Sequence, residues 1–328
     1  MQHYRFKWED RLFTIGVSIG LVVIDEASGT LSSVLSAADA ACYVAKERGR
    51  NQIHVYQPKD SDLVRHRSEM QWVARIHRAL EENRLRLYWQ EVRPVAHSER
   101  EVCHIEILVR MLDEQGNLIL PMAFIPAAER YALMPRLDRW IIQKTMETCG
   151  QCMTVLGKKD CLFAINLSGV SLKDPVFRNW LIDVLKQHPQ ISQHLCFEIT
   201  ETAAIGNLSV VNSFIAELQR FGCRFALDDF GSGLSSFSYL KNLKVDYLKI
   251  DGAFVQDMDK EALDYSMVEA IQRIASQFGI KTVAEFVESQ SVLECLEKIG
   301  VDYAQGSYLR KPEPIELLAT LLPERIRT

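Results

Sequence analysis

Short apolar strands alternate with helical segments along most of this 328-residue chain, and this alternation constrains the fold more than any other feature. Over about 240 residues, such alternation favours a parallel sheet, because parallel strands are joined by helical crossovers. Eight units predict an α/β fold with a closed (βα)₈ barrel, and an open doubly wound sheet is the alternative. The eight predicted strands are LRLYWQ, HIEILVR, LFAINLS, LCFEIT, FALDD, YLKID, TVAEF and YAQGSYL.

Seven of these strands carry polar or charged residues, mostly near their carboxyl ends, although a strand buried on both faces is normally apolar. A solvated terminus explains any one of them, but seven strands with the same feature indicate a shared site. In a barrel the carboxyl ends of the strands converge on one mouth, where active sites are built. The residues are Glu106, Asn166, Glu198, Asp228, Asp229, Lys249, Glu285 and Gln305.

Five carboxylates in one pocket need cations, because burial and mutual repulsion would otherwise raise their pKa values and neutralise them. Lys249 alone does not balance five acids. Oxygen ligands without His or Cys favour Mg²⁺ or Mn²⁺, and five acids exceed what one Mg²⁺ normally takes from a protein. Two ions are therefore expected, an arrangement that hydrolyses phosphate esters by activating water and stabilising the attacking and leaving oxygens.

The adjacent acids Asp228 and Asp229 precede a glycine-rich stretch, GSGLSS. Neighbouring side chains of a strand point to opposite faces, so both acids reach the mouth only if the chain turns there. Gly231 and Gly233 allow such a bend. The stretch lacks the last glycine of a dinucleotide-binding fingerprint, which argues against a Rossmann site.

From about Arg75 to Leu318, the chain resembles the EAL domain, the cyclic di-GMP phosphodiesterase module of bacteria, whose fold is a TIM-like barrel. The matching segments are EIL in EILVR, NLS, EITE, DDFGSG, LKID, AEFVE and QGSYLRKP. The sequence departs from the commonest family pattern at Ile107, at Phe286, where glycine is frequent, and at Ser307, where an aromatic residue is common. None of these departures removes a catalytic group.

The resemblance implies a role for each site residue. One ion would be held by Glu106, Asn166, Glu198 and Asp228, and a second by Asp228, Asp229 and Glu285. The catalytic set would be Lys249, Gln305, Glu285 and Glu201. Lys249 would orient or deprotonate the attacking water, and Gln305 would help to place it. Glu201 would brace the loop after Asp229 and link it to a dimer interface. Substrate binding would involve Gln90, Arg110 and Glu288.

The resemblance also implies a metal-dependent hydrolysis of cyclic di-GMP to linear pGpG, in a homodimer formed through the EAL domain. A receptor that binds the nucleotide without cleaving it is the alternative, although such receptors usually lack a metal ligand or the lysine. A barrel enzyme acting on another phosphate ester is a third possibility. With a net charge of −5 and no single-sign block, the chain is not expected to bind a nucleic-acid polymer.

Residues 1–57 resemble the C-terminal part of a GGDEF domain, the diguanylate cyclase module, through VSIG, AADAACYVAKERGRN and VYQ. The GGDEF motif is absent from this sequence, and the segment is too small to fold well alone. A truncated α+β remnant is therefore expected at residues 1–57, a helical linker at 58–83 and the EAL domain at 84–328. Further GGDEF and sensory domains would lie upstream in the full-length protein.

The longest nearly uncharged run, Leu12 to Ile24, is too short to span a bilayer. Eight cysteines without disulfide-like clustering fit a reducing compartment, so we expect a cytoplasmic protein or the cytoplasmic portion of a membrane-anchored one. Cys149 and Cys152 form a CGQC, which we interpret as packing, because a structural zinc site needs a second pair.

Overall fold

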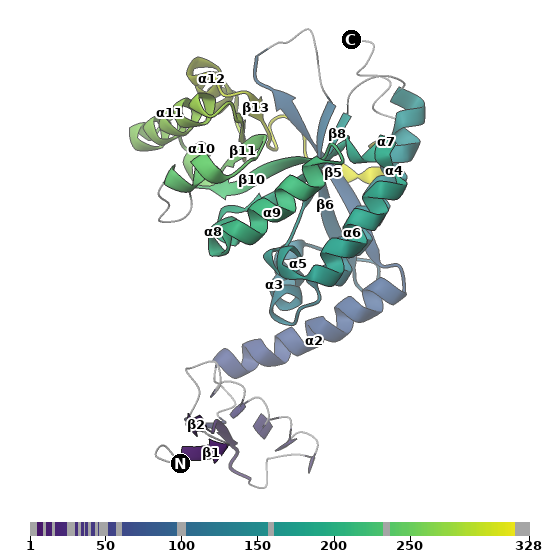
Figure 1. Ribbon diagram of the computed structural model, residues 1–328, viewed down its shortest axis with the longest axis vertical. Helices are drawn as coiled ribbons and strands as arrows, with labels where there is room; N and C mark the ends of the chain where they lie inside the picture. The colour runs from purple at the N-terminus through teal and green to yellow at the C-terminus, as the bar shows by residue number, and fades with distance from the viewer. Residues whose placement is uncertain are drawn as a thin grey trace. The chain divides into compact units, whose positions relative to one another are not determined.

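The computed structural model describes residues 5–8, 11–14, 17–24, 52–56, 61–96, 103–156, 161–231 and 237–318, with scattered positions from 30 to 45 (Figure 1). The chain divides into two compact units, Met1–Arg78 and Ala79–Thr328. Each unit is described separately below. No helix in the described part of the chain is both long and apolar enough to cross a membrane.

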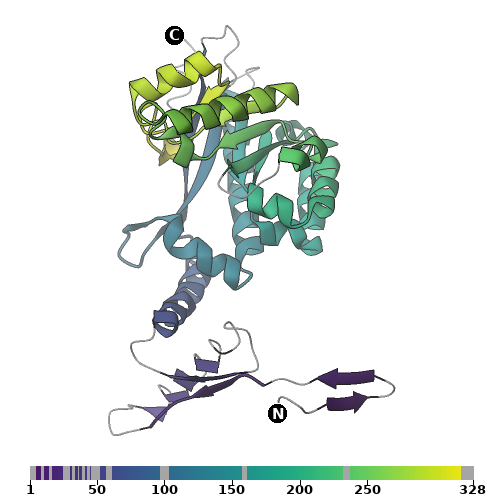
Figure 2. The ribbon, with the colours of Figure 1, turned by 90° about the vertical axis from the view of Figure 1, so that its left-hand side faces the viewer.

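The second unit is built on one ten-stranded sheet, of which eight strands close into a barrel (Figure 1, Figure 2). Closure follows because β5 pairs with β13 on one side and with β6 on the other. The predicted closed barrel is confirmed, and the open sheet is excluded. The barrel strands are β5 (Leu85–Pro94), β6 (Cys103–Leu112), β8 (Cys161–Asn166), β9 (Leu195–Thr200), β10 (Arg224–Phe230), β11 (Tyr247–Ile250), β12 (Lys281–Ala284) and β13 (Tyr303–Ala304).

One part of the prediction is wrong, because β5 runs antiparallel to both of its neighbours, β6 and β13. The connection between β5 and β6, residues 95–102, is too short for the helical crossover that parallel strands need, which takes about a dozen residues. The resulting hairpin places Gln90 directly opposite Glu106. Short strands β7 (Leu118–Ile119) and β14 (Glu313–Pro314) pair with β6 and β5 outside the barrel.

Helices cover the outside of the barrel and bury one apolar face each (Figure 1). In α9, for example, Val211, Phe214, Ile215 and Leu218 are buried at helical spacing, and Asn207 caps the first turn. The helices are α3 (Pro121–Arg130), α4 (Met134–Leu156), α5 (Gly169–Lys173), α6 (Pro175–Gln187), α7 (Pro189–Ser192), α8 (Glu201–Gly206), α9 (Leu208–Gln219), α10 (Gly252–Val255), α11 (Ala262–Gln277) and α12 (Gln290–Ile299), with 3₁₀ turns η1 (Phe237–Asn242) and η2 (Ile315–Leu317).

Strand alternation separates an apolar outer layer from a polar interior. On β6, Ile105 and Ile107 belong to the main apolar core, and Glu106 between them is buried on the other face. A smaller cluster, which includes Ala164, Ala226 and Val283, forms a separate core of its own. Each of these three residues lies two positions before a polar residue near its strand's end, so the small core fills the interior next to the polar layer.

The first unit contains an antiparallel pair, β1 (Arg5–Trp8) and β2 (Arg11–Thr14), and a parallel pair, β3 (Ile19–Leu21) and β4 (Ile53–Val55). The described positions between 31 and 45 are helical. A Cβ on Gly20 would lie 2.2 Å from the Ala38 carbonyl oxygen, so glycine permits this helix to approach β3. The predicted linker helix is α2 (Ser61–Glu81), and the division between units falls within it.

Candidate active site

Lys249 lies at the centre of the polar layer inside the barrel and is almost completely buried. Its Nζ atom lies 2.8 Å from Glu198 Oε2, 2.9 Å from Glu285 Oε1, 3.2 Å from Asp228 Oδ1 and 3.4 Å from Glu106 Oε2. The four acids come from β6, β9, β10 and the residue that follows β12. The barrel therefore gathers four carboxylates, from positions as far apart as 106 and 285, around one ammonium group.

Burial and charge act in opposite directions on this cluster. Burial alone would lower the pKa of Lys249, but the surrounding carboxylates, Asp228 first, raise the pKa well above its usual value. Burial would raise the pKa of Glu106, but the Lys249 charge and the hydrogen bonds from Gln305 and Asn166 together lower it. Lys249 is therefore an ammonium ion, and Glu106 is a carboxylate.

The remaining acids exceed what Lys249 neutralises. Burial raises the pKa of Glu198 well above its usual range and the pKa of Glu285 to about 8, although Lys249 opposes both shifts. Burial, then the charges of Asp228 and Asp251, also raise the pKa of Asp229. Without a further cation, part of this cluster is protonated at neutral pH.

Two amides fix the orientation of Glu106. Asn166 Nδ2 donates to Glu106 Oε1 at 2.7 Å, and Gln305 Nε2 donates to Glu106 Oε2 at 2.6 Å. With Nδ2 bonded to Glu106, the carbonyl oxygen of Asn166 is the atom of this amide that can hold a cation. Gln305 Oε1 is buried and accepts no hydrogen bond from the described residues, so it can accept one from a water.

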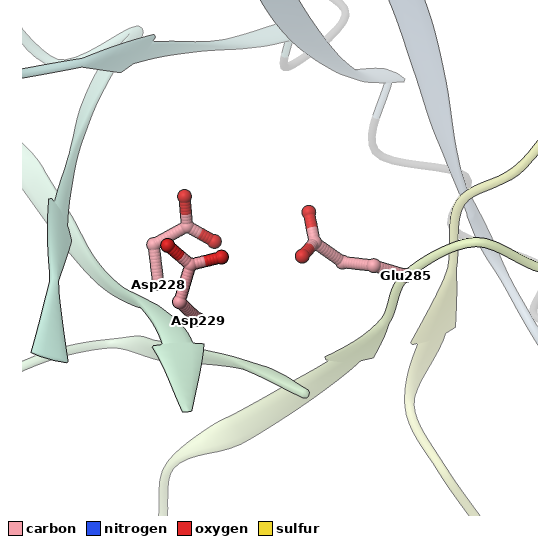
Figure 3. Close-up of side chains that lie close together, drawn as sticks. All are labelled: Asp228, Asp229 and Glu285. Carbon is pink, nitrogen blue, oxygen red and sulfur yellow. The ribbon is translucent and has the colours of Figure 1, made fainter. Parts of the chain in front are cut away.

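Asp228, Asp229 and Glu285 form a compact group of potential metal ligands, with one oxygen from each within 4.8 Å of the others (Figure 3). The adjacent acids reach the same place because the β10 register shifts between Leu227 and Phe230, and Asp229 has a left-handed φ of 53°. The turn expected at this strand end is therefore present. An all-oxygen donor set of this kind fits Mg²⁺ or Mn²⁺.

Glu201, the first residue of α8, joins two segments on either side of residues 232–236. Its Oε2 accepts a hydrogen bond from the Gly231 backbone N–H at 3.0 Å, and its Oε1 accepts one from the Tyr239 hydroxyl. Gly233 and the other residues of 232–236, in the loop after Asp229, lie outside the described residues. The carboxylate of Glu201 thus connects Gly231, two residues after Asp229, to Tyr239 in η1.

The three predicted substrate-binding residues lie in different places. Gln90 lies beside the cluster, where it accepts from Gln305 Nε2 at 3.1 Å and donates to the Arg310 carbonyl at 2.8 Å. Arg110 lies on the same strand as Glu106, four residues further along, with its guanidinium 5.6 Å from the centre of the Tyr88 ring. Glu288 is exposed, and no contact among the described residues joins it to the cluster.

The CGQC residues lie on α4 as buried thiols. Burial raises the pKa of Cys149 to about 12 and the pKa of Cys152 to about 11, which makes both poor thiolates. Although Cys161 belongs to the same apolar core and Cys103 packs against it, the described cysteines form no compact group of three metal ligands. Packing therefore accounts for this pair.

Sequence reasoning missed a buried acid next to the site. Asp138 lies on α4 and accepts hydrogen bonds from Ser168 and Ser171, just after Asn166. The strand-end pattern could not identify Asp138, because it lies on a helix and not at the end of a strand. The available signal was Ser168 in the NLS segment, because this hydroxyl lies two residues after the predicted ligand Asn166.

The fold and the site define a closed α/β barrel whose strand ends carry an acidic centre suited to hard divalent cations. The chain belongs to the EAL domain family, whose sequence profile matches residues 73–312.

Named relatives cover most of the chain. It is 40% identical over 307 residues to the cyclic di-GMP phosphodiesterase PdeB of Shewanella oneidensis, covering 92% of this chain and 35% of that protein. It is 31% identical over 310 residues to the cyclic di-GMP phosphodiesterase PdeA of Borreliella burgdorferi, covering 94% and 45%. The chain thus spans less than half the length of these relatives.

A solved structure, the FimX EAL domain from Pseudomonas aeruginosa bound to c-di-GMP, superposes with a TM-score of 0.67 and 31% sequence identity. The match covers 74% of this chain and 96% of that domain.

Proposed function

We propose that this chain is a metal-dependent phosphodiesterase that hydrolyses cyclic di-GMP to linear pGpG. The observation that carries the proposal is the compact group of Asp228, Asp229 and Glu285, in which two members also contact Lys249. The names of the relatives and the nucleotide bound by the FimX domain support the choice of substrate.

The residues that would hold the ions follow from the donor set. Glu106, Asn166, Glu198 and Asp228 would bind one Mg²⁺ or Mn²⁺, and Asp228, Asp229 and Glu285 would bind a second. Once bound, such ions lower the pKa of a water molecule and neutralise charge on the phosphate. Asp228 would belong to both sets because it contacts Lys249, as Glu106 and Glu198 do, and also lies in the compact group with Asp229 and Glu285.

The chain's own groups would position the reactants. The four surrounding carboxylates keep Lys249 an ammonium ion, so it would orient the attacking water as a hydrogen-bond donor and would not remove its proton. Gln305 Oε1, which accepts no hydrogen bond from the described residues, would accept one from the same water. Attack at phosphorus would break one P–O bond of the ring and release linear pGpG.

Arg110 would bind a substrate phosphate through its planar guanidinium, and Gln90 would contact the dinucleotide from the opposite strand. The Tyr88 ring supports the guanidinium of Arg110 from one face. Glu288 would contribute at the exposed edge of the site. Glu201 would keep residues 231 and 239 in place, which connects the site to the segment proposed to contact a second subunit.

The test is hydrolysis of cyclic di-GMP in Mg²⁺ or Mn²⁺, with pGpG identified by chromatography. Wild type should produce pGpG, and Glu106→Ala and Lys249→Ala should produce none, whereas Asp257→Ala, at an exposed surface pair, should match wild type. Hydrolysis by Glu106→Ala at the wild-type rate would contradict the assignment. If wild type binds cyclic di-GMP without cleaving it, the chain is a receptor. If it cleaves another phosphate ester faster, that ester replaces cyclic di-GMP as the proposed substrate.

We further propose that residues 1–57 are the C-terminal part of a GGDEF domain, followed by a linker at 58–83 and the EAL domain at 84–328. The parallel pair of β3 and β4, with helical positions between them in sequence, supports this assignment. The greater length of the relatives supports further domains in the full-length protein, which we propose lie upstream. We also propose that the full-length protein is a cytoplasmic homodimer. Light scattering of the purified chain tests the dimer, and a single subunit mass would contradict it.

A further inference from the structure

Asp138 is a buried carboxylate that contacts the turn next to the acidic centre. It lies near the start of α4 with 1% of its surface exposed. Its Oδ2 atom accepts hydrogen bonds from Ser171 Oγ at 2.6 Å, from Ser168 Oγ at 2.8 Å and from the Ser168 backbone N–H at 3.3 Å. All hydrogen bonds that this carboxylate accepts from the described residues therefore come from one short stretch of chain.

That stretch connects β8 to α5 and carries Asn166. Ser168 caps α5, because its Oγ accepts from the Ser171 backbone N–H at 3.1 Å. Between Asn166 and Ser168, Leu167 is buried and its N–H donates to the Glu198 carbonyl at 2.8 Å. Ser168 is thus fixed by Asp138 and Leu167 by β9, which together determine where the Asn166 side chain can point.

The direction of the Asn166 amide matters for the site, because its Nδ2 donates to Glu106 Oε1. The amide itself is exposed at the mouth of the barrel, so neighbouring side chains do not enclose it. Its orientation depends on the backbone at Asn166, and therefore on the turn that follows.

A carboxylate is a costly group to bury, and this one is only partly compensated. Burial, opposed by the serine hydrogen bonds and reinforced by the charge of Glu129 on α3, raises the pKa of Asp138 to about 6. Its Oδ1 accepts no hydrogen bond from the described residues. Because burying this carboxylate is costly, a contribution to stability does not account for an acid at position 138. Its three hydrogen bonds to one turn do account for it.

We propose that Asp138 is a positioning residue that sets the Asn166 amide for binding a divalent cation and for holding Glu106. The proposal rests on the proposed function, since it assigns Asp138 to the metal site of that reaction. Partners that orient metal ligands in this way commonly affect metal affinity or activity by about 10–100-fold.

The experiment compares Asp138→Ala and Asp138→Asn with wild type and with Thr145→Ala. Thr145 is a matched control on the same helix, since it is fully buried and its Oγ1 donates only within α4, to the Ile141 carbonyl at 2.8 Å. For each variant, the Mn²⁺ concentration at half-maximal pGpG formation, kcat, KM and the melting temperature are measured. The same series is then titrated with Mn²⁺ alone by calorimetry.

Asp138→Ala should need roughly tenfold more Mn²⁺ than wild type, with kcat reduced and KM for cyclic di-GMP nearly unchanged. Asp138→Asn should restore most of the Mn²⁺ affinity, because its carbonyl oxygen can accept the same three hydrogen bonds. Thr145→Ala should lower the melting temperature without changing the Mn²⁺ requirement. Equal Mn²⁺ affinity in Asp138→Ala and Thr145→Ala would overturn the proposal and leave Asp138 a structural residue.

Calorimetry distinguishes failure of the proposed reaction from failure of the proposed role of Asp138. If wild type binds Mn²⁺ but forms no pGpG, only the proposed reaction is contradicted. Asp138→Ala would still have to bind Mn²⁺ more weakly. If Asp138→Ala does not fold, Ser171→Ala removes the shortest of the three contacts. An Mn²⁺ affinity equal to that of wild type in that variant would also overturn the proposal.

Discussion

At the scale of single residues, Lys249 is the buried cation that the acidic cluster of the barrel interior surrounds. Its ammonium group lies within 3.4 Å of four carboxylates that otherwise face one another. Removing one partner of a buried ion pair leaves uncompensated charge, which costs about 3–5 kcal/mol. Lys249→Met should therefore lower the free energy of unfolding by about that amount in EDTA.

The loss should depend on pH. Because the pKa of Glu285 is raised to about 8, this carboxyl is mostly protonated at pH 6 and ionised at pH 9. The carboxylates repel one another more strongly when ionised, so Lys249→Met should lose more stability at pH 9 than at pH 6. Urea unfolding at the two pH values measures this difference, and an equal loss at both would contradict the prediction.

Asp138 makes the stability of the wild-type protein itself depend on pH. Its pKa is raised from 3.8 to about 6, so the folded chain binds this proton more tightly than the unfolded chain does. The stabilisation is present below pH 3.8 and is lost as pH rises through about 6. At 1.36 kcal/mol per pKa unit, wild type should lose about 2–3 kcal/mol relative to Asp138→Asn over this range. A constant difference between the two proteins would show that Asp138 keeps its ordinary pKa.

At the scale of elements, the sequence pattern identified all eight barrel strands but misjudged the direction of β5. Apolar alternation reports which face of a strand is buried and contains no information about its direction. The short connection at residues 95–102 held the missing information, because only an antiparallel neighbour can be reached over it. Polar strand ends likewise predicted the acidic centre, whereas Asp138 on α4 contacts the turn next to that centre only through tertiary packing.

A close contact between α10 and the segment after β12 gives a prediction at this scale. A Cβ on Gly252 would lie 2.3 Å from Cδ2 of Phe286, whose φ of 55° is unusual for a bulky residue. Gly252→Ala should therefore destabilise the protein by about 1–3 kcal/mol, as overpacking does. In a Phe286→Gly background the same substitution should be nearly neutral, because the three nearest atoms all belong to the Phe286 side chain.

A double-mutant cycle of unfolding free energies measures this coupling, which should reach about 1 kcal/mol or more. Additive effects of the two substitutions would mean that the Phe286 ring moves away without cost.

At the scale of the whole molecule, the acidic centre joins strands that are far apart in the sequence. Its proposed ligands lie on β6, β8, β9 and β10 and just after β12, so bound ions would connect most of the barrel circumference. The unfolded chain cannot reproduce that arrangement, because residues 106 and 285 are brought together only by barrel closure. Metal binding should therefore be linked to the stability of the whole barrel.

Addition of Mn²⁺ at about 100 times its dissociation constant should stabilise the protein by about 2.7 kcal/mol. For a domain of this size, that corresponds to a rise in melting temperature of roughly 5–10 °C, which EDTA should reverse. Asp229→Asn should lose much of the rise, because its carboxylate belongs to the compact ligand group, whereas Asp257→Asn on the surface should keep it. Calorimetric melting of the three proteins measures the effect. An equal Mn²⁺ shift in all three would place the stabilising ion away from Asp229.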